Sequence, residues 1–327
     1  MLAYKGSYSM APKDPSKSTS EIVAVCIPCF NEELTVADVV LSFKVALPNS
    51  DIYVFDNCST DKTAALAKRA GATVIPSTNP GKGNVVRHIF SSVHADHYLL
   101  VDGDSTYSAK MAPALLSFAR NKRLDMAIGR RCTPPEELTH AYRPMHQLGN
   151  LLVCRLIQLS FRTPLQDVFS GYRIFSREFA KSIPLRSPGF QIEVEMTLQA
   201  LSKGFRIAEL DTPYTSRPAG SFSKLNTYRD GLLVLSTFAS ICRDYRPQLF
   251  FAFLGSCLAL GSLAAGLAPI YDYWCFRWVY HLPLAVLAVG LAVLSALTFC
   301  IGIILETQLK YHNELFFLMR KRLNTPV

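Results

Sequence analysis

Several signatures that would assign this 327-residue chain to a class of protein are missing. Its nine cysteines are odd in number and irregularly spaced, which argues against a disulfide framework and favours a reducing compartment. His94 and His97 lack the companion ligands of a zinc site. No basic–aromatic motif accompanies the formal net charge of +9, so nucleic acid is not an expected partner. A membrane face with anionic lipid accounts better for this charge.

The first 20 residues lack the apolar core of a secretory signal, and we expect a disordered tail over 1–20. Charged side chains are missing from two long stretches near the other end, residues 248–270 and 282–305. Each stretch reaches the length of about 20 apolar residues that a helix needs to cross a bilayer. The sequence therefore predicts two transmembrane helices within 247–306.

Basic residues flank the two predicted spans on their outer sides. The linker 271–281 has a single arginine, Arg277, which Asp272 balances. The positive-inside rule then places the large domain, both termini and a basic tail over 307–327 in the cytoplasm. The outer basic residues are Lys224, Arg229, Arg243 and Arg246 before the first span, and Lys310, Arg320, Lys321 and Arg322 after the second.

An amphipathic stretch, residues 225–246, precedes the first predicted span. Its leucines and its charged residues recur at helical spacing. Such a helix either lies on the bilayer surface or packs on the sheet as a core helix, and periodicity does not separate the two. We expect a juxtamembrane, interfacial helix here.

Residues 21–224 alternate short apolar runs with helical patterns. This alternation is typical of βαβ units, and it predicts an α/β domain with a Rossmann-like, doubly wound and mostly parallel sheet. The expected strands are 22–29, 51–56, 73–76, 98–102, 125–129 and 206–213, with a loop and strand over 165–175.

Two acidic residues, Asp102 and Asp104, follow the fourth apolar run. In an open α/β sheet, ligands bind outside the carboxyl ends of the strands. Two carboxylates there form a hard-oxygen site suited to Mg²⁺ or Mn²⁺ holding a diphosphate. The alternative is a simple acidic turn, because Asp-Gly is a common turn dipeptide.

Three other loops follow predicted strands and should line the same edge of the sheet: Pro28–Glu33, Asp56–Asp61 and Gly81–Asn84. Asp56 and Glu32 could accept hydrogen bonds from a base or a ribose. Lys82 offers charge to a phosphate, and the glycines beside it let backbone approach a ligand closely. The spacing of a P-loop is absent. The alternatives are that Asp56 caps a helix and that Lys82 is a solvated loop lysine.

Together, five segments resemble the family 2 glycosyltransferases with the GT-A fold: Pro28-Cys-Phe-Asn-Glu-Glu33, Asp56-Asn-Cys-Ser-Thr-Asp61, Gly81-Lys-Gly-Asn84, Asp102-Gly-Asp104 and Ser170-Gly-Tyr-Arg173. More narrowly, the chain is similar to dolichol-phosphate mannose synthases and bacterial undecaprenyl-phosphate sugar transferases. The resemblance covers roughly 21–225, and two C-terminal spans are typical of one branch. It implies a multi-pass protein of the bacterial inner membrane, and a homo-oligomer, with a tetramer among the options.

The resemblance also implies the reaction. A metal-dependent, inverting enzyme would transfer one sugar from a nucleotide sugar to polyprenyl phosphate, with a UDP-sugar favoured over GDP-mannose. Because the attacking phosphate oxygen is already anionic, a strong general base is hardly needed. The metal acts as a Lewis acid on the leaving diphosphate, and arginines neutralise and position the acceptor.

Individual residues take roles from the resemblance in the same way. Asp104, Asp167 and Arg173 are the expected catalytic residues, with Asp167 acting as a base or orienting the acceptor. Asp102 and Asp104 bind the metal. The resemblance alone places Glu193, rather than Glu195, near the sugar of the donor. The donor would contact Pro28, Asn31, Glu32, Asp56, Lys82, Asp102, Gly103, Asp104, Glu193 and Arg217, and the acceptor phosphate Arg143, Ser170, Arg173 and Lys224.

Two other functions remain open at this point. A processive polysaccharide synthase of the same fold carries a Gln-x-x-Arg-Trp segment, of which only Arg277-Trp278 is present, between the spans. A non-catalytic scaffold that binds nucleotide sugars predicts a damaged metal site, whereas Asp102 and Asp104 are both present.

Overall fold

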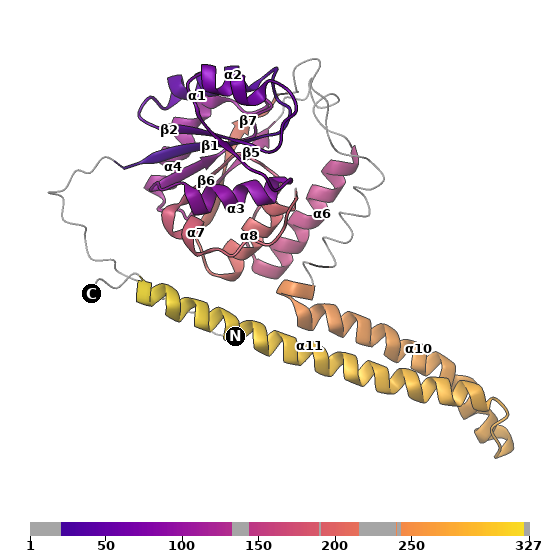
Figure 1. Cartoon of the computed structure of the whole chain (residues 1–327). Coiled ribbons are helices and arrows are strands. Elements are labelled where there is room, and N and C mark those ends of the chain that lie inside the picture. The colour runs from indigo at the N-terminus through magenta and orange to yellow at the C-terminus, as the bar shows by residue number, and fades with distance from the viewer. Residues whose placement is uncertain (1–20, 133–143, 190, 216–239, 241–242, 324–327) are drawn as a thin grey trace.

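A computed structural model of the chain describes residues 21–132, 144–189, 191–215, 240 and 243–323. An α/β domain sits beside one end of a long hairpin of two helices (Figure 1). The expected tail 1–20, most of the amphipathic stretch 225–246 and three expected site residues lie outside the described residues. Those three are Arg143, Arg217 and Lys224.

The domain is built on a seven-stranded sheet with the order β3-β2-β1-β4-β6-β5-β7. Only β6 runs antiparallel to its neighbours, β4 and β5, while the other neighbours pair in parallel. This confirms the predicted mostly parallel, doubly wound sheet. The strands are β1 (Val23–Cys29), β2 (Asp51–Asp56), β3 (Thr73–Pro76), β4 (His97–Leu100), β5 (Met126–Cys132), β6 (Arg173–Ser176) and β7 (Ile207–Pro213).

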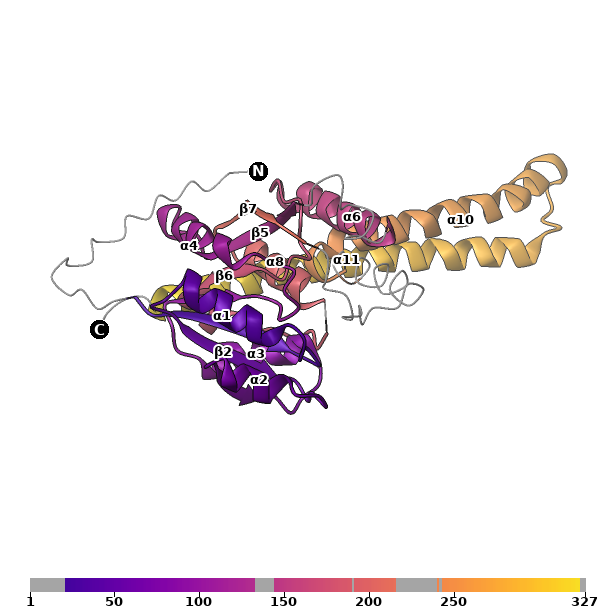
Figure 2. The same ribbon diagram turned by 90° about the horizontal axis from the view of Figure 1, so that it is seen from above.

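Helices cover both faces of this sheet (Figures 1 and 2). Alternate residues of β1 enter two different cores, Val25 and Ile27 on one face and Ala24 and Cys26 on the other. The strand therefore reads as an unbroken apolar run, because side chains alternate across a strand and both faces are buried. The first face carries α1 (Val36–Ala46), α2 (Thr63–Arg69), the 3₁₀ turn η1 (Ala109–Met111) and α4 (Ala112–Asn121), and the second α3 (Lys82–Ser92), α7 (Arg177–Ser182) and α8 (Ile192–Ser202).

A further helix, α6 (Pro144–Phe161), packs on α8 through a third core that contains Val153, Ile157 and Leu198. Its C-terminal end meets the start of the hairpin. There Arg246 donates to the carbonyl of Ser160, and its guanidinium lies 5.3 Å from the ring centroid of Phe161.

The hairpin consists of α10 (Pro247–Phe276) and α11 (Leu282–Leu323), both long and apolar enough to cross a membrane. At 1.5 Å per residue they are about 45 and 63 Å long. Small residues let the two helices pack closely. Ser295 Oγ donates to the carbonyl of Gly255 at 2.9 Å, and Ser262 Oγ donates to that of Ala288 at 2.7 Å.

The C-terminal region differs from the expected separate tail. The helix α11 does not end with the apolar stretch at 305 but continues to Leu323. This extension contacts the α/β domain, where the rings of Phe316 and Phe205 lie 6.2 Å apart and Arg320 pairs with Glu178. The start of α10 and the end of α11 therefore both lie at the end of the hairpin that meets the domain.

Candidate active site

Asp102 and Asp104 lie just beyond the carboxyl end of β4, in a turn held from two sides. Thr35 Oγ1 donates to the carbonyl of Gly103 at 2.7 Å. A Cβ at Gly103 would lie 2.6 Å from Cys29 Sγ, so a larger residue there would have to displace the Cys29 side chain. Oδ1 of Asp104 accepts from the amide of Thr106 at 3.2 Å and from its hydroxyl at 2.6 Å. Asp104 is only 4% exposed, and these contacts fix the position of its carboxylate.

Lys82 joins Asp102 to Glu193, which comes from a distant part of the chain. Its Nζ lies 2.5 Å from Oδ1 of Asp102 and 2.5 Å from Oε1 of Glu193. Burial would lower the pKa of Lys82, but the charges of both carboxylates and its hydrogen bonds to them raise that pKa well above the ordinary value. The ammonium is therefore a permanent positive charge at the acid pair.

Glu193 and Glu195, two residues apart on α8, have different partners, as their spacing predicts. The carboxylate of Glu195 accepts from the amides of Arg186 and Ser187 at 2.8 and 2.7 Å, whereas that of Glu193 meets Lys82. The structure thus places Glu193 on the side of the acid pair.

Glycines 81 and 83 pack closely against a distant segment of backbone. A Cβ at Gly81 would lie 2.4 Å from the carbonyl oxygen of Pro188, and one at Gly83 would lie 1.9 Å from that of Ser187. The amide of Gly83 donates to Pro188 at 2.9 Å. The glycines therefore admit the backbone of 187–188 against the start of α3, and this packing helps to place Lys82. The expected close approach to a ligand stays a prediction.

The loops after β1 and β2 form one connected wall. Asn31 adopts a positive φ of 52°, its amide donates to Ser59 Oγ at 2.9 Å, and its Oδ1 accepts from the amide of Thr60 at 2.8 Å. The amide of Glu32 donates to Thr63 Oγ1 at 2.8 Å. Pro28 is paired in β1 opposite Phe55 of β2. This arrangement brings the expected donor residues to one edge of the sheet.

Two carboxylate oxygens at this edge are buried and have no hydrogen-bond partner within the described part of the chain: Oδ1 of Asp56, at the end of β2, and Oε2 of Glu193. A buried acceptor without a donor is costly, so most such groups in folded proteins are satisfied. Both atoms are therefore candidates to receive N–H or O–H groups from a ligand.

A cation that the sequence reasoning missed lies on β5. Arg131 binds Asp167 through its amide at 3.1 Å, Nε at 2.7 Å and a terminal guanidinium nitrogen at 2.7 Å. Its guanidinium also lies 5.4 Å from the ring centroid of Tyr214. Burial raises the pKa of Tyr107, and the charge of Arg131 opposes this rise while that of Asp102 adds to it. The charges of Arg131 and Asp102 thus both influence the pKa of Tyr107.

Asp167 is consequently not a free base. It is 4% exposed and is held in a bidentate ion pair with Arg131. Its expected alternative role, orienting the acceptor, stays a prediction.

The structure does not support the predicted direct contact of Arg173 and Ser170 with an acceptor phosphate, because both residues are fully buried. Arg173 donates to the carbonyls of Ser170 and Val168 and to the hydroxyl of Thr197, at 2.8, 2.6 and 2.8 Å. Ser170 Oγ donates to a backbone carbonyl of β5 at 2.6 Å. Both residues hold the loop whose Gly171 packs against Asp102, where a Cβ would lie 2.3 Å from its Oδ2.

The acid pair offers two carboxylates to a metal ion. No group of three or more His, Cys, Asp or Glu side chains suited to a metal occurs in the part of the chain that the structure describes. Asp102 and Asp104 supply hard oxygens, and Asp102 is still 28% exposed at its side chain. Mg²⁺ is commonly held by one or two carboxylates together with substrate phosphates, so this donor set fits such an ion on a diphosphate.

Comparison with known proteins agrees with this arrangement. The sequence model of "Glycosyl transferase family 2" matches residues 24–183. The glycosyltransferase AglJ of Haloferax volcanii is 29% identical over 299 residues, which cover 90% of this chain and 96% of AglJ. Protein RfbJ of Shigella flexneri is 49% identical over 125 residues, which cover 38% of this chain and 95% of RfbJ. The chain belongs to glycosyltransferase family 2.

Two further similarities extend the comparison of this family 2 glycosyltransferase. A dolichyl-phosphate hexose transferase of Haloferax volcanii is 25% identical over 232 residues, which cover 71% of this chain and 98% of that protein. The crystal structure of glucosyl-3-phosphoglycerate synthase from Mycobacterium tuberculosis, in complex with Mn²⁺ and uridine-diphosphate-glucose, superposes with a TM-score of 0.54 at 19% identity. It covers 68% of this chain and 78% of the synthase, and confirms the GT-A fold.

Proposed function

We propose that this family 2 glycosyltransferase moves one sugar from a nucleotide sugar to polyprenyl phosphate, such as undecaprenyl phosphate, at a membrane surface. The observation that carries the proposal is the contact between a domain bearing the acid pair and a hairpin of two apolar helices. A lipid acceptor keeps its phosphate at the bilayer surface, where such an anchor is useful. The relative named as a dolichyl-phosphate hexose transferase supports the same acceptor chemistry.

The donor is held at the wall formed by the loops after β1 and β2. Oδ1 of Asp56, buried and without a partner among the described residues, is suited to an N–H of the base. Asp102 and Asp104 would hold Mg²⁺ or Mn²⁺, which polarises the leaving diphosphate when bound. The fold neighbour crystallised with Mn²⁺ and UDP-glucose favours a UDP-sugar.

Lys82 and Glu193 complete the donor side. Lys82 supplies a fixed positive charge beside Asp102, where a diphosphate would otherwise meet only carboxylates. Glu193 uses one oxygen for Lys82 and keeps Oε2 for a hydroxyl of the sugar. The protein thereby orients the sugar before it reacts.

Arg131 is the described cation best placed for the acceptor phosphate. Asp167 fixes its guanidinium, so little conformational freedom is lost when an anion binds. A phosphate oxygen then attacks the anomeric carbon as the bond from that carbon to the diphosphate breaks, and the configuration inverts. Arg143, Arg217 and Lys224 remain proposed as further cations for the two anionic substrates, and the basic flanks favour a cytoplasmic active site in a bacterial inner membrane.

The function is tested by incubating the purified full-length protein with undecaprenyl phosphate, Mn²⁺ and a panel of labelled UDP- and GDP-sugars. We expect one donor to yield a product of one sugar per lipid phosphate, measured by mass spectrometry of the organic phase. Long glycan chains would favour a processive synthase, and donor binding without any product would favour a scaffold.

A further inference from the structure

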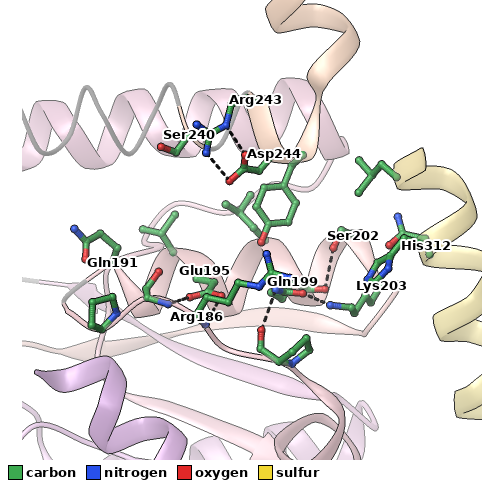
Figure 3. Close-up of a pocket in the computed structure, with 18 residues that line it drawn as sticks. Arg186, Gln191, Glu195, Gln199, Ser202, Lys203, Ser240, Arg243, Asp244 and His312 are labelled. Carbon is green, nitrogen blue, oxygen red and sulfur yellow. Dashed lines mark hydrogen bonds and ion pairs between the residues drawn. The ribbon is translucent and has the colours of Figure 1, made fainter. Parts of the chain in front are cut away.

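A cavity lies on the opposite side of α8 from the acid pair. It has a volume of about 650 Å³ and is bounded by α8, the segment 184–188, residues 243–245 and α11 (Figure 3). Glu195 lines this cavity, whereas Glu193 meets Lys82. The cavity is thus separate from the proposed transfer site.

The cavity contains a buried cation without a matching acid. Lys203 is 3% exposed, and its Nζ donates to Oε1 of Gln199 and lies 5.0 Å from the ring centroid of Phe316. No carboxylate of the described residues lies within 4.0 Å of it. The pKa of Lys203 is lowered to about 8, mainly by burial and also by the charge of nearby Arg186, while the charge of Glu195 opposes both effects. A buried charge that lacks a counterion is costly, so the site favours an anion.

The other charges around the cavity leave an excess of positive charge. Arg186, Arg243 and His312 line it together with Lys203. The two acids are already engaged, since Glu195 accepts from the amides of Arg186 and Ser187, and Asp244 pairs with Arg243 at 2.7 Å. An entering phosphate would meet cations that can turn toward it.

The cavity lies at the level where the apolar helices begin and end. Residues 243–245 come directly before α10, and residues 309–313 follow the apolar stretch of α11 by one to two turns. Apolar side chains line the cavity beside the charges: Pro184, Val194, Leu198, Tyr245 and Leu309. A basic cavity with apolar walls at this level matches a lipid headgroup and the first part of its chains.

We propose that this cavity binds the phosphate group of an anionic membrane lipid, at a place distinct from the acid pair. The inference rests on the membrane attachment in the proposed function, but not on the donor or the acceptor.

Such a lipid would stabilise the active site through a shared wall. Ser187 and Pro188 line the cavity, and the carbonyl of Pro188 accepts from the amide of Gly83 beside Lys82. A ligand that fixes this segment therefore also fixes the start of α3.

The test is the thermal unfolding of the full-length protein in detergent with added phosphatidylglycerol, phosphatidylcholine or inorganic phosphate. At a lipid concentration ~100 times Kd, phosphatidylglycerol should raise Tm by ~5 °C or more, and the other two should not. Lys203→Met should lose most of that rise. The control Lys310→Met, which changes an exposed lysine of α11 outside the cavity, should keep it.

An equal rise with phosphatidylcholine, or an undiminished rise in Lys203→Met, would overturn the inference. A full rise with inorganic phosphate alone would reject a lipid as the ligand. If Lys203→Met does not fold, native mass spectrometry can count the phosphatidylglycerol retained by Arg186→Gln and by Lys310→Met, and equal retention in both would reject the site.

Sugar transfer measured in the same preparations separates this inference from the proposed function. Transfer to undecaprenyl phosphate without a specific lipid effect would overturn only the lipid site. A specific lipid effect with transfer to a water-soluble acceptor would overturn only the proposed function.

Discussion

The ion triad of Lys82, Asp102 and Glu193 gives a prediction that needs no substrate. Lys82→Met removes the one ammonium shared by two carboxylates, of which the Glu193 side chain is 4% exposed and that of Asp102 is 28% exposed. The variant leaves Glu193 as a buried charge without its counterion. We expect a lower free energy of unfolding, and we expect Glu193→Gln to restore part of it.

The size of the effect follows from this burial. Removing one partner of a buried pair costs about 3–5 kcal/mol, and the partial exposure of Asp102 places the loss for Lys82→Met near the lower end. For a domain of 150–250 residues, each kcal/mol shifts Tm by about 2–4 °C, so Tm should fall by ~6–12 °C. Adding Glu193→Gln should recover ~2–4 °C, which is a coupling of about 1 kcal/mol.

The assay must report on the α/β domain. Tryptophan fluorescence is unsuitable because Trp274 and Trp278 lie at the far end of the helical hairpin. Cys26 and Cys29 in β1 are buried, so their reaction with a thiol dye during heating reports the domain, after the exposed thiols have been blocked. A fall in the Tm of the double variant equal to the sum of the falls in the two single variants would refute the triad as a coupled unit.

Three further substitutions test the neighbouring parts of the site. Asp56→Asn should weaken UDP binding, measured by calorimetry, by ~5–100-fold, and an unchanged affinity would reject its contact with the base. Arg131→Gln should lower kcat/KM for the lipid acceptor by ~10–100-fold with donor affinity unchanged, while Arg130→Gln, which alters a pair with Asp211 instead, should have little effect. Gly83→Ala should destabilise the domain by ~1–3 kcal/mol because of the contact with Ser187, and a stable variant would contradict that packing.

The fold could be predicted largely from local patterns. β1 enters two cores, so the sequence shows an unbroken apolar run, and Asp102 follows β4 closely enough for its position at the edge of the sheet to be inferred. The doubly wound sheet then brings the loops after β1, β2 and β4 together without any further information.

Partners across the sheet could not be predicted in this way. The resemblance of the Ser170–Arg173 segment implies a phosphate contact, but Arg173 is fully buried beneath the site. Local spacing does not encode this burial. The sequence pattern does not single out Arg131, because it ends this strand at Gly129, whereas pairing with β7 extends β5 to Cys132. The continuation of α11 to Leu323 depends in the same way on its contacts with the domain.

The central claim is that the acceptor is a lipid phosphate. The most direct measurement offers the full-length protein undecaprenyl phosphate and a water-soluble phosphate, 3-phosphoglycerate, in one reaction with a labelled nucleotide sugar and Mn²⁺. The proposed function predicts label in the organic phase with the wild-type protein and none with Asp104→Asn, whose side chain can still accept from Thr106 and leave the protein folded. Label in the aqueous phase on 3-phosphoglycerate, or unchanged transfer by Asp104→Asn, would contradict it.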